Sequence, residues 1–118
     1  MKPFPDEHDL IAFFECEPVV AYDDSPWFYN HLTYTTNRGE DRIVCEIEPG
    51  DYILKFQWFK NNDRIVCLDL HWVSAIMIET DYQSEAMVAT FKDKNIAPLR
   101  MQLKPHVAVA WGTTAVPT

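Results

Sequence analysis

The chain has 118 residues, of which 47% are hydrophobic and 24% charged, and its formal net charge is −8. This length is enough for one core that removes roughly two-thirds of the unfolded chain's surface from water, and we expect a single domain over residues 1–118. The acidity disfavours direct binding to nucleic acid or to anionic lipid, and favours a basic protein partner, because opposite charges raise the encounter rate.

The negative charge is concentrated in the first half of the chain. Residues 1–51 hold twelve Asp or Glu and three Lys or Arg, a balance of −9, whereas residues 52–118 hold six and seven, a balance of +1. The opening residues lack the apolar core of a secretory signal, and no apolar run is long enough to span a bilayer. Cys16, Cys45 and Cys67 are odd in number and without C-x-x-C spacing, which favours reduced thiols and a cytoplasmic location.

Residues 6–16 are compatible with two structures. The acidic side chains of Asp6, Glu7 and Asp9 would be favourable at the start of a helix, ahead of Leu10 and the apolar residues that follow. The stretch IAFFEC could equally begin a sheet, and the pattern leaves both open. Further along, FYNHLTYTT at 28–36 alternates as expected for a strand.

The middle of the chain predicts two hairpins. The stretches at 42–47 and 52–59 alternate in polarity and are separated by the turn signal EPGD, with Ile47 predicted opposite Tyr52. The next turn, predicted as a three-residue loop over 61–63, would place Lys55 opposite Asp69. This register keeps Asp69 out of the aromatic core, where burying an unpaired carboxylate would cost several kcal/mol.

Cys67, Asp69 and His71 would then share the solvent-facing side of a strand that continues through Trp72. Three such side chains could ligate a metal, with His31 or His106 completing the shell. However, residues four apart on a strand are about 13 Å apart at their backbones, too far to share one ion without a bulge. We therefore expect no metal site, no cofactor and no catalytic set.

The remainder of the chain alternates strands with one uncertain segment. Strands are expected at 74–80, 98–105 and 106–112. Residues 80–95 are predicted as a short helix begun by Thr80 and Gln83, with a strand as the alternative. The expected fold is mainly β, a β-sandwich or a strongly curved antiparallel sheet with one or two short helices, with α+β as the alternative.

One loop, AYDDSPWFYN at 21–30, combines acidic and aromatic residues, as protein-recognition surfaces do. The candidate partner-binding residues are Tyr22, Asp23, Asp24, Trp27 and Tyr29 in this loop, and Glu46 and Glu48 on the solvent-facing side of the strand expected at 43–48. The alternative is structural: Trp27 and Phe28 would close one end of the core, the two Asp residues would solvate a turn, and Glu46 would lie near Lys55.

Three function classes follow. We favour an acidic binding module, specifically an inhibitor or immunity-type protein that masks a basic partner such as a nuclease toxin, with a nucleic-acid mimic as a close relative of that class. The second class is a small-molecule binder or enzyme whose pocket would be lined by Tyr52, Trp58, Trp72 and Trp111, with His31 or His106 for polar contacts. The third is a self-associating subunit, such as a homodimer joined at an exposed strand edge.

Overall fold

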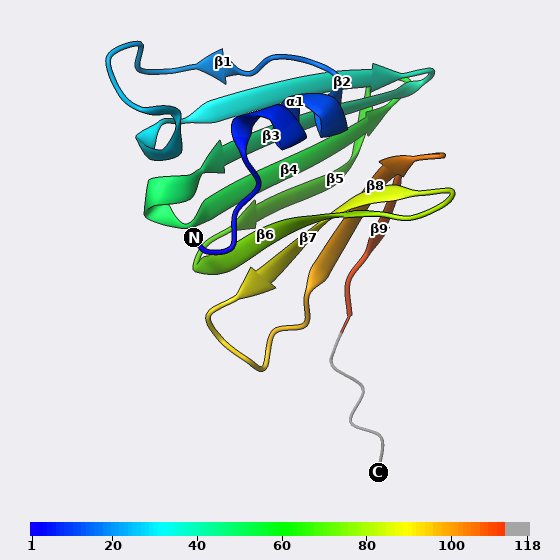
Figure 1. Ribbon diagram of the computed structural model, residues 1–118. Helices are drawn as coiled ribbons and strands as arrows, with labels where there is room; N and C mark the ends of the chain where they lie inside the picture. The colour runs from blue at the N-terminus through cyan, green and yellow to red at the C-terminus, as the bar shows by residue number, and fades with distance from the viewer. Residues whose placement is uncertain (113–118) are drawn as a thin grey trace.

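A computed structural model describes residues 1–112, and residues 113–118 of the expected 1–118 domain lie outside the described part. The fold is mainly β, with two antiparallel sheets and one short helix (Figure 1). Sheet A has the order β1-β2-β3-β4-β5, and sheet B has the order β6-β7-β8-β9. The expectation of a mainly β fold is confirmed.

The strands of sheet A are β1 (Val19–Val20), β2 (Leu32–Arg38), β3 (Asp41–Glu48), β4 (Ile53–Lys60) and β5 (Asp63–Leu70). Those of sheet B are β6 (Val73–Thr80), β7 (Glu85–Phe91), β8 (Leu99–Lys104) and β9 (Ala108–Ala110). Two short 3-10 helices, η1 (Trp27–Tyr29) and η2 (Pro49–Asp51), lie in the connections of sheet A. No helix among residues 1–112 is long and apolar enough to cross a membrane.

The first ambiguous segment is the helix α1 (Glu7–Phe14). The side chain of Asp6 caps it by accepting a hydrogen bond from the backbone N–H of Asp9 at 2.8 Å, and Glu15 ends it in the left-handed conformation. Leu10, Phe13 and Phe14 are buried on one face, consistent with their helical spacing. The ring of Phe14 stacks on Tyr34 of β2 with centroids 4.6 Å apart, so α1 covers the inner face of sheet A.

The core lies between the inner faces of the two sheets and the helix. Sheet A contributes Leu32, Tyr34, Ile43, Cys45, Ile47, Leu54 and Phe56, and sheet B contributes Val73, Ile76, Met87, Ala89, Leu99, Met101 and Leu103. Burying each large apolar side chain stabilises the fold by about 1.5–3 kcal/mol. Because these residues alternate along their strands, each strand leaves a second, partly polar face toward solvent.

The register of the first hairpin differs from the prediction by two residues. Ile47 pairs with Leu54 instead of Tyr52, because η2 occupies Pro49–Asp51 and Tyr52 takes the left-handed conformation at its end. A shift of two conserves the face of every side chain, so Cys45 and Ile47 are buried as expected.

The second hairpin reaches the expected pairing through a different turn. The turn has two residues, Asn61 and Asn62, both at positive φ, where the prediction had three. A bulge then inserts one extra residue, Ile65, between Arg64 and Val66. The bulge restores the parity, and Lys55 lies opposite Asp69 as predicted.

Two other predictions were wrong. β5 ends at Leu70, and Trp72 has φ of 61° at the passage into sheet B, so Trp72 does not continue the strand. Residues 80–95 contain β7 and no helix: Asp81 makes a tight turn by accepting hydrogen bonds from the backbone N–H groups of Gln83 and Ser84. Pairing with both β6 and β8 outweighs the weak helical spacing of this segment.

Candidate functional site

The loop between β1 and β2 is held in shape by one buried amide. Asn30 is 2% exposed, and its Nδ2 donates to the carbonyl oxygens of Tyr22 at 2.5 Å and Ser25 at 3.3 Å. Its Oδ1 accepts from the backbone N–H groups of Tyr22 and His31, both at 3.0 Å. Four hydrogen bonds therefore tie the two ends of the loop together. This role was not predicted, since an Asn before a strand carries no distinctive signal.

The aromatic residues of the loop divide into two groups. Trp27 and Phe28 are partly buried and contact Phe4, with ring centroids 5.5 and 5.8 Å apart, respectively. Trp27 also packs against the core, which agrees with the structural alternative for this side chain. Tyr22 and Tyr29 project into solvent and are 59% and 70% exposed. These two rings are the part of the cluster that a partner could cover.

Acidic side chains surround the two exposed tyrosines. Asp23 and Asp24 are exposed in the loop itself. η1 packs against η2, as the approach of the Tyr29 side chain to Gly50 shows. η2 begins directly after Glu48, and its last residue is the exposed Asp51. The loop, η2 and the end of β3 thus bring carboxylates from three segments to one end of sheet A.

Glu46 and Glu48 are held by a histidine that was not predicted to pair with them. The Nε2 atom of His31 lies 3.0 Å from Glu46 Oε1, and its Nδ1 lies 3.8 Å from Glu48 Oε1. Glu46 was predicted to lie near Lys55, and the two-residue shift in register places it directly opposite that residue. All three side chains of the His–Glu group are about three-quarters buried. Glu46 and Glu48 therefore have a polar side-chain neighbour within 4 Å, whereas Asp23 and Asp24 have no such neighbour among residues 1–112.

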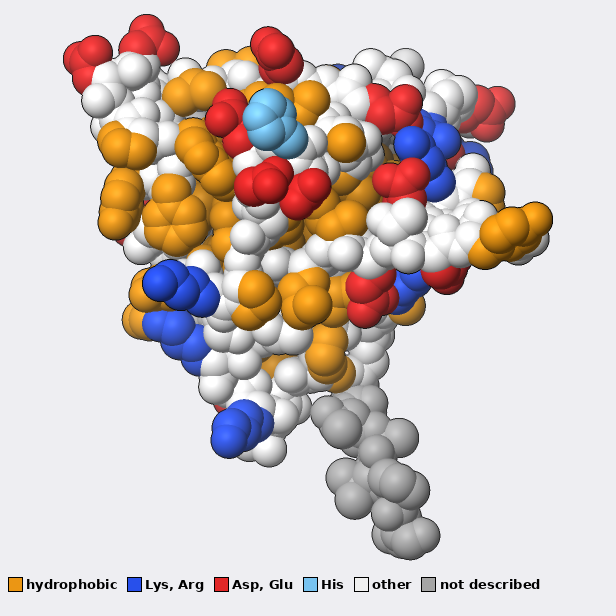
Figure 2. All heavy atoms as spheres, viewed as in Figure 1, with side chains coloured by type: hydrophobic (Ala, Val, Ile, Leu, Met, Phe, Trp, Pro, Cys, Tyr) orange, Lys and Arg blue, Asp and Glu red, His pale blue; other side chains and the backbone are white. Residues whose placement is uncertain are grey.

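The net charge belongs to one layer of the molecule. Residues 1–70, which contain α1 and all of sheet A, carry fourteen Asp or Glu and six Lys or Arg, a balance of −8, whereas residues 71–118 carry four of each. In Figure 2, acidic side chains gather over the half of the visible face that α1 and sheet A occupy, and several Lys or Arg side chains lie toward sheet B. The field at the exposed tyrosines is accordingly negative.

The residues Cys67, Asp69 and His71 form no cluster that could hold an ion. Asp69 Oδ1 lies 3.2 Å from His71 Nε2, and both side chains are more than half exposed. Cys67 is exposed and its thiol is free. Within residues 1–112, no group of three or more His, Cys, Asp or Glu side chains has a metal-binding arrangement.

The aromatic residues predicted to line a small-molecule pocket are dispersed. Trp58 donates to Asp41 Oδ1 at 2.9 Å, and Trp111 stacks on Phe91 with centroids 5.8 Å apart. Trp72 is 66% exposed, and Lys92 Nζ lies 3.5 Å from the Tyr52 ring centroid and 5.2 Å from that of Trp72. The structure does not assemble these rings into one lining.

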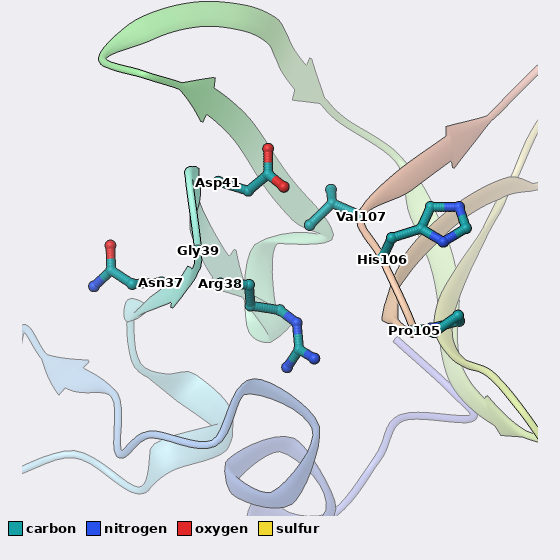
Figure 3. A pocket seen from close by; sticks show the side chains of 7 residues that line it. All are labelled: Asn37, Arg38, Gly39, Asp41, Pro105, His106 and Val107. Atoms are coloured by element: carbon teal, nitrogen blue, oxygen red, sulfur yellow. The ribbon is translucent and has the colours of Figure 1, made fainter.

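An open hollow of about 500 Å³ lies between the β2–β3 turn and the start of β9, and His106 is on its rim (Figure 3). Its side chains do not converge: His106 points away from Asp41 and from Arg38 in Figure 3. Arg38 is instead paired with Glu15 at 2.8 Å. The hollow therefore provides no set of groups aimed at a common ligand atom.

Comparison with known proteins finds one kind of similarity. A chain of the structure described as "Contact-dependent growth inhibition toxin - immunity protein complex from Klebsiella pneumoniae 342" matches this chain with a TM-score of 0.80 and 18% sequence identity. The match covers 94% of this chain and 96% of that chain. No protein-family model and no curated protein matches. At this identity the likeness establishes a shared fold.

Proposed function

We propose that this chain is an immunity-type inhibitor: a non-catalytic, acidic module of the cytoplasm that binds and masks a basic partner such as a nuclease toxin. The observation that carries the proposal is the placement of the entire net charge of −8 on the layer of α1 and sheet A, with Tyr22 and Tyr29 exposed among its carboxylates. The full-length fold similarity to a chain of a toxin–immunity complex supports the same class.

The physical basis is electrostatic steering followed by aromatic anchoring. Complementary charge raises association rates from about 10⁵–10⁶ to as much as 10⁸–10⁹ M⁻¹ s⁻¹ at low salt. Exposed tyrosines supply large contact area at little conformational cost, and such residues carry much of the energy of protein interfaces. An inhibitor that works by covering a partner's surface needs no catalytic group of its own.

The partner-binding residues of this proposal are those of the loop and of β3. Tyr22, Asp23, Asp24 and Tyr29 would make direct contact because they are exposed. Glu46 and Glu48 would add to the field, and Trp27 would act by supporting the loop from below.

The first experiment separates inhibitor from toxin. The chain is expressed alone in bacterial cells, and then used as bait for proteins of its source cell, with elution over a salt gradient. An immunity protein leaves growth unchanged and releases a basic protein only as salt rises, because screening shortens the reach of the charges to about 8 Å at physiological ionic strength. Growth arrest on expression of the chain alone would contradict the proposal and indicate the toxin. Capture of an acidic partner, or of none at low salt, would also contradict it.

A further inference from the structure

β5 is the long open edge of the molecule. It has eight residues, and none of its backbone groups hydrogen-bonds to any segment beyond β4 within residues 1–112. The other described edges are shorter or partly covered: β1 has two residues and β9 has three. The N-terminal segment covers the first part of the outer β6 edge, through hydrogen bonds from Lys2 N to Ser74 O at 2.9 Å and from Ile76 N to Pro3 O at 3.0 Å. An uncovered edge of this length is a template for another strand.

The bulge decides which side chains this edge presents to solvent. Arg64 lies opposite Phe59, and Cys67 lies opposite Gln57, so the extra residue makes Arg64 and Cys67 consecutive on the outer face. Asp69 follows on the same face, opposite Lys55. On the inner face, Val66 and Leu68 lie on either side of Cys67 along the strand.

This order is self-complementary. A second β5 placed antiparallel, with a twofold axis through Cys67, sets Arg64 of each copy opposite Asp69 of the other. On the inner face the same operation sets Val66 opposite Leu68 twice. Two opposite-charge pairs and two apolar pairs result, which are the combinations that favour antiparallel pairing. Without the bulge, Ile65 would lie opposite Asp69 and both ion pairs would be lost.

We propose that two copies of this chain pair edge to edge through β5, antiparallel about a twofold axis at Cys67, to form one continuous ten-stranded sheet. Both charged side chains that the new contacts require are exposed. The Arg64 guanidinium has only a 3.4 Å hydrogen bond to Gln57, and Asp69 contacts an exposed His71. The loop with Tyr22 and Tyr29 adjoins β1 at the opposite edge of sheet A, so such a dimer leaves it open for a different partner.

The first test uses Cys67 as a reporter of the twofold axis. Directly opposed residues in an antiparallel pair have Cβ atoms about 4.5–5.5 Å apart, within reach of a short bis-maleimide. The chain carries Cys16→Ser to remove the other partly exposed thiol, while Cys45 is fully buried. We expect rapid formation of a covalent dimer that disappears in a further Cys67→Ser variant. Cross-linking no faster than that of two unassociated chains would overturn the proposal.

The second test exchanges the charges. Asp69→Arg alone and Arg64→Asp alone should each weaken the dimer about tenfold, because each replaces two attractive pairs by two repulsive ones. The double variant restores the attraction and should recover the wild-type dissociation constant in sedimentation velocity. Glu79→Arg is the matched control, since Glu79 has the same side-chain exposure of 59% as Asp69 but lies on sheet B.

Far-UV circular dichroism confirms that each variant is folded before its association is measured. A protein that sediments as a monomer at every concentration would overturn the proposal. So would a dimer that the two single reversals leave unchanged, because its contact would lie elsewhere. Failure of this dimer would leave the proposed inhibitor function intact, since that function rests on a separate surface.

Discussion

Reversing the two loop carboxylates should slow binding to the partner without weakening the fold. Asp23 and Asp24 are exposed, and within residues 1–112 neither side chain makes a hydrogen bond or an ion pair. Asp23→Lys with Asp24→Lys changes the net charge from −8 to −4, because each reversal adds two positive units. Half of the net charge is thus removed at one end of sheet A.

The expected effect is on the association rate. Steering by a localised field raises association rates by about 10- to 1,000-fold, and halving the charge halves the logarithm of that gain, so the low-salt association rate should fall by about 3- to 30-fold. The difference should shrink as salt is added, because screening acts on both proteins. The free energy of unfolding should change by less than about 0.5 kcal/mol, as for other exposed positions.

The assay is surface plasmon resonance or stopped-flow fluorescence with the captured basic partner, at two salt concentrations. The matched control is Glu79→Lys with Asp93→Lys, which has the same net charge of −4 but changes residues of the sheet B half. A slower rate for the loop variant than for the control shows that position matters beyond net charge. Equal association rates for the loop variant and the wild type would refute the steering reasoning.

Three further predictions concern the fold that presents this surface. Tyr34→Phe should leave the free energy of unfolding in urea unchanged or raise it by up to about 1 kcal/mol, because the buried Tyr34 hydroxyl has no hydrogen-bond partner within residues 1–112. A fall in the free energy of unfolding by more than about 1 kcal/mol would show that the hydroxyl has a hydrogen-bond partner. Asn30→Ala should cost about 1–3 kcal/mol and increase hydrogen exchange in residues 22–31, because it leaves buried backbone groups unpaired; unchanged exchange would contradict the role given to this amide. The hydrogen bond from Lys104 lowers the pKa of Glu15, and Arg38 contributes a smaller part. The ionised Glu15 therefore stabilises the folded state above the unfolded pKa of about 4.3, and this stabilisation is lost as the pH falls through the folded pKa. The stability difference between wild type and Glu15→Gln should therefore shrink in acid, and a difference that stays constant with pH would exclude this ion pair as its source.

The sequence predicts the faces of strands better than it predicts their turns. Alternation identifies Cys45, Ile47 and Phe56 as core residues, and burial of apolar area enforces that assignment. Turn geometry depends on backbone conformations that the pattern does not encode. Tyr52 and Asn61 adopt positive φ, and each alters a predicted pairing near its turn.

The surface site is only partly predictable for a similar reason. Composition identifies the loop as acidic and aromatic, but it does not tell which of its aromatic rings are exposed. Trp27 is partly buried because it packs on Phe4, a contact distant in sequence, whereas Tyr22 and Tyr29 are exposed. The contact of His31 with Glu46 joins neighbouring strands fifteen residues apart in sequence. It depends on the β2–β3 register, and the alternation of the two strands alone leaves that register open.

The bulge in β5 shows how one local irregularity serves two requirements. A two-residue turn followed by regular pairing would have directed Asp69 into the core, where an unpaired carboxylate costs several kcal/mol. One extra residue returns Asp69 to solvent opposite Lys55 and also spaces Arg64 from Cys67 so that the edge becomes self-complementary. Removing the extra residue, by deleting Ile65, should therefore destabilise the fold and abolish the β5 dimer together, whereas the charge reversals at Arg64 and Asp69 should act mainly on the dimer, with a cost to the fold below about 1 kcal/mol. That separation distinguishes an edge organised for pairing from a bulge that only corrects the register.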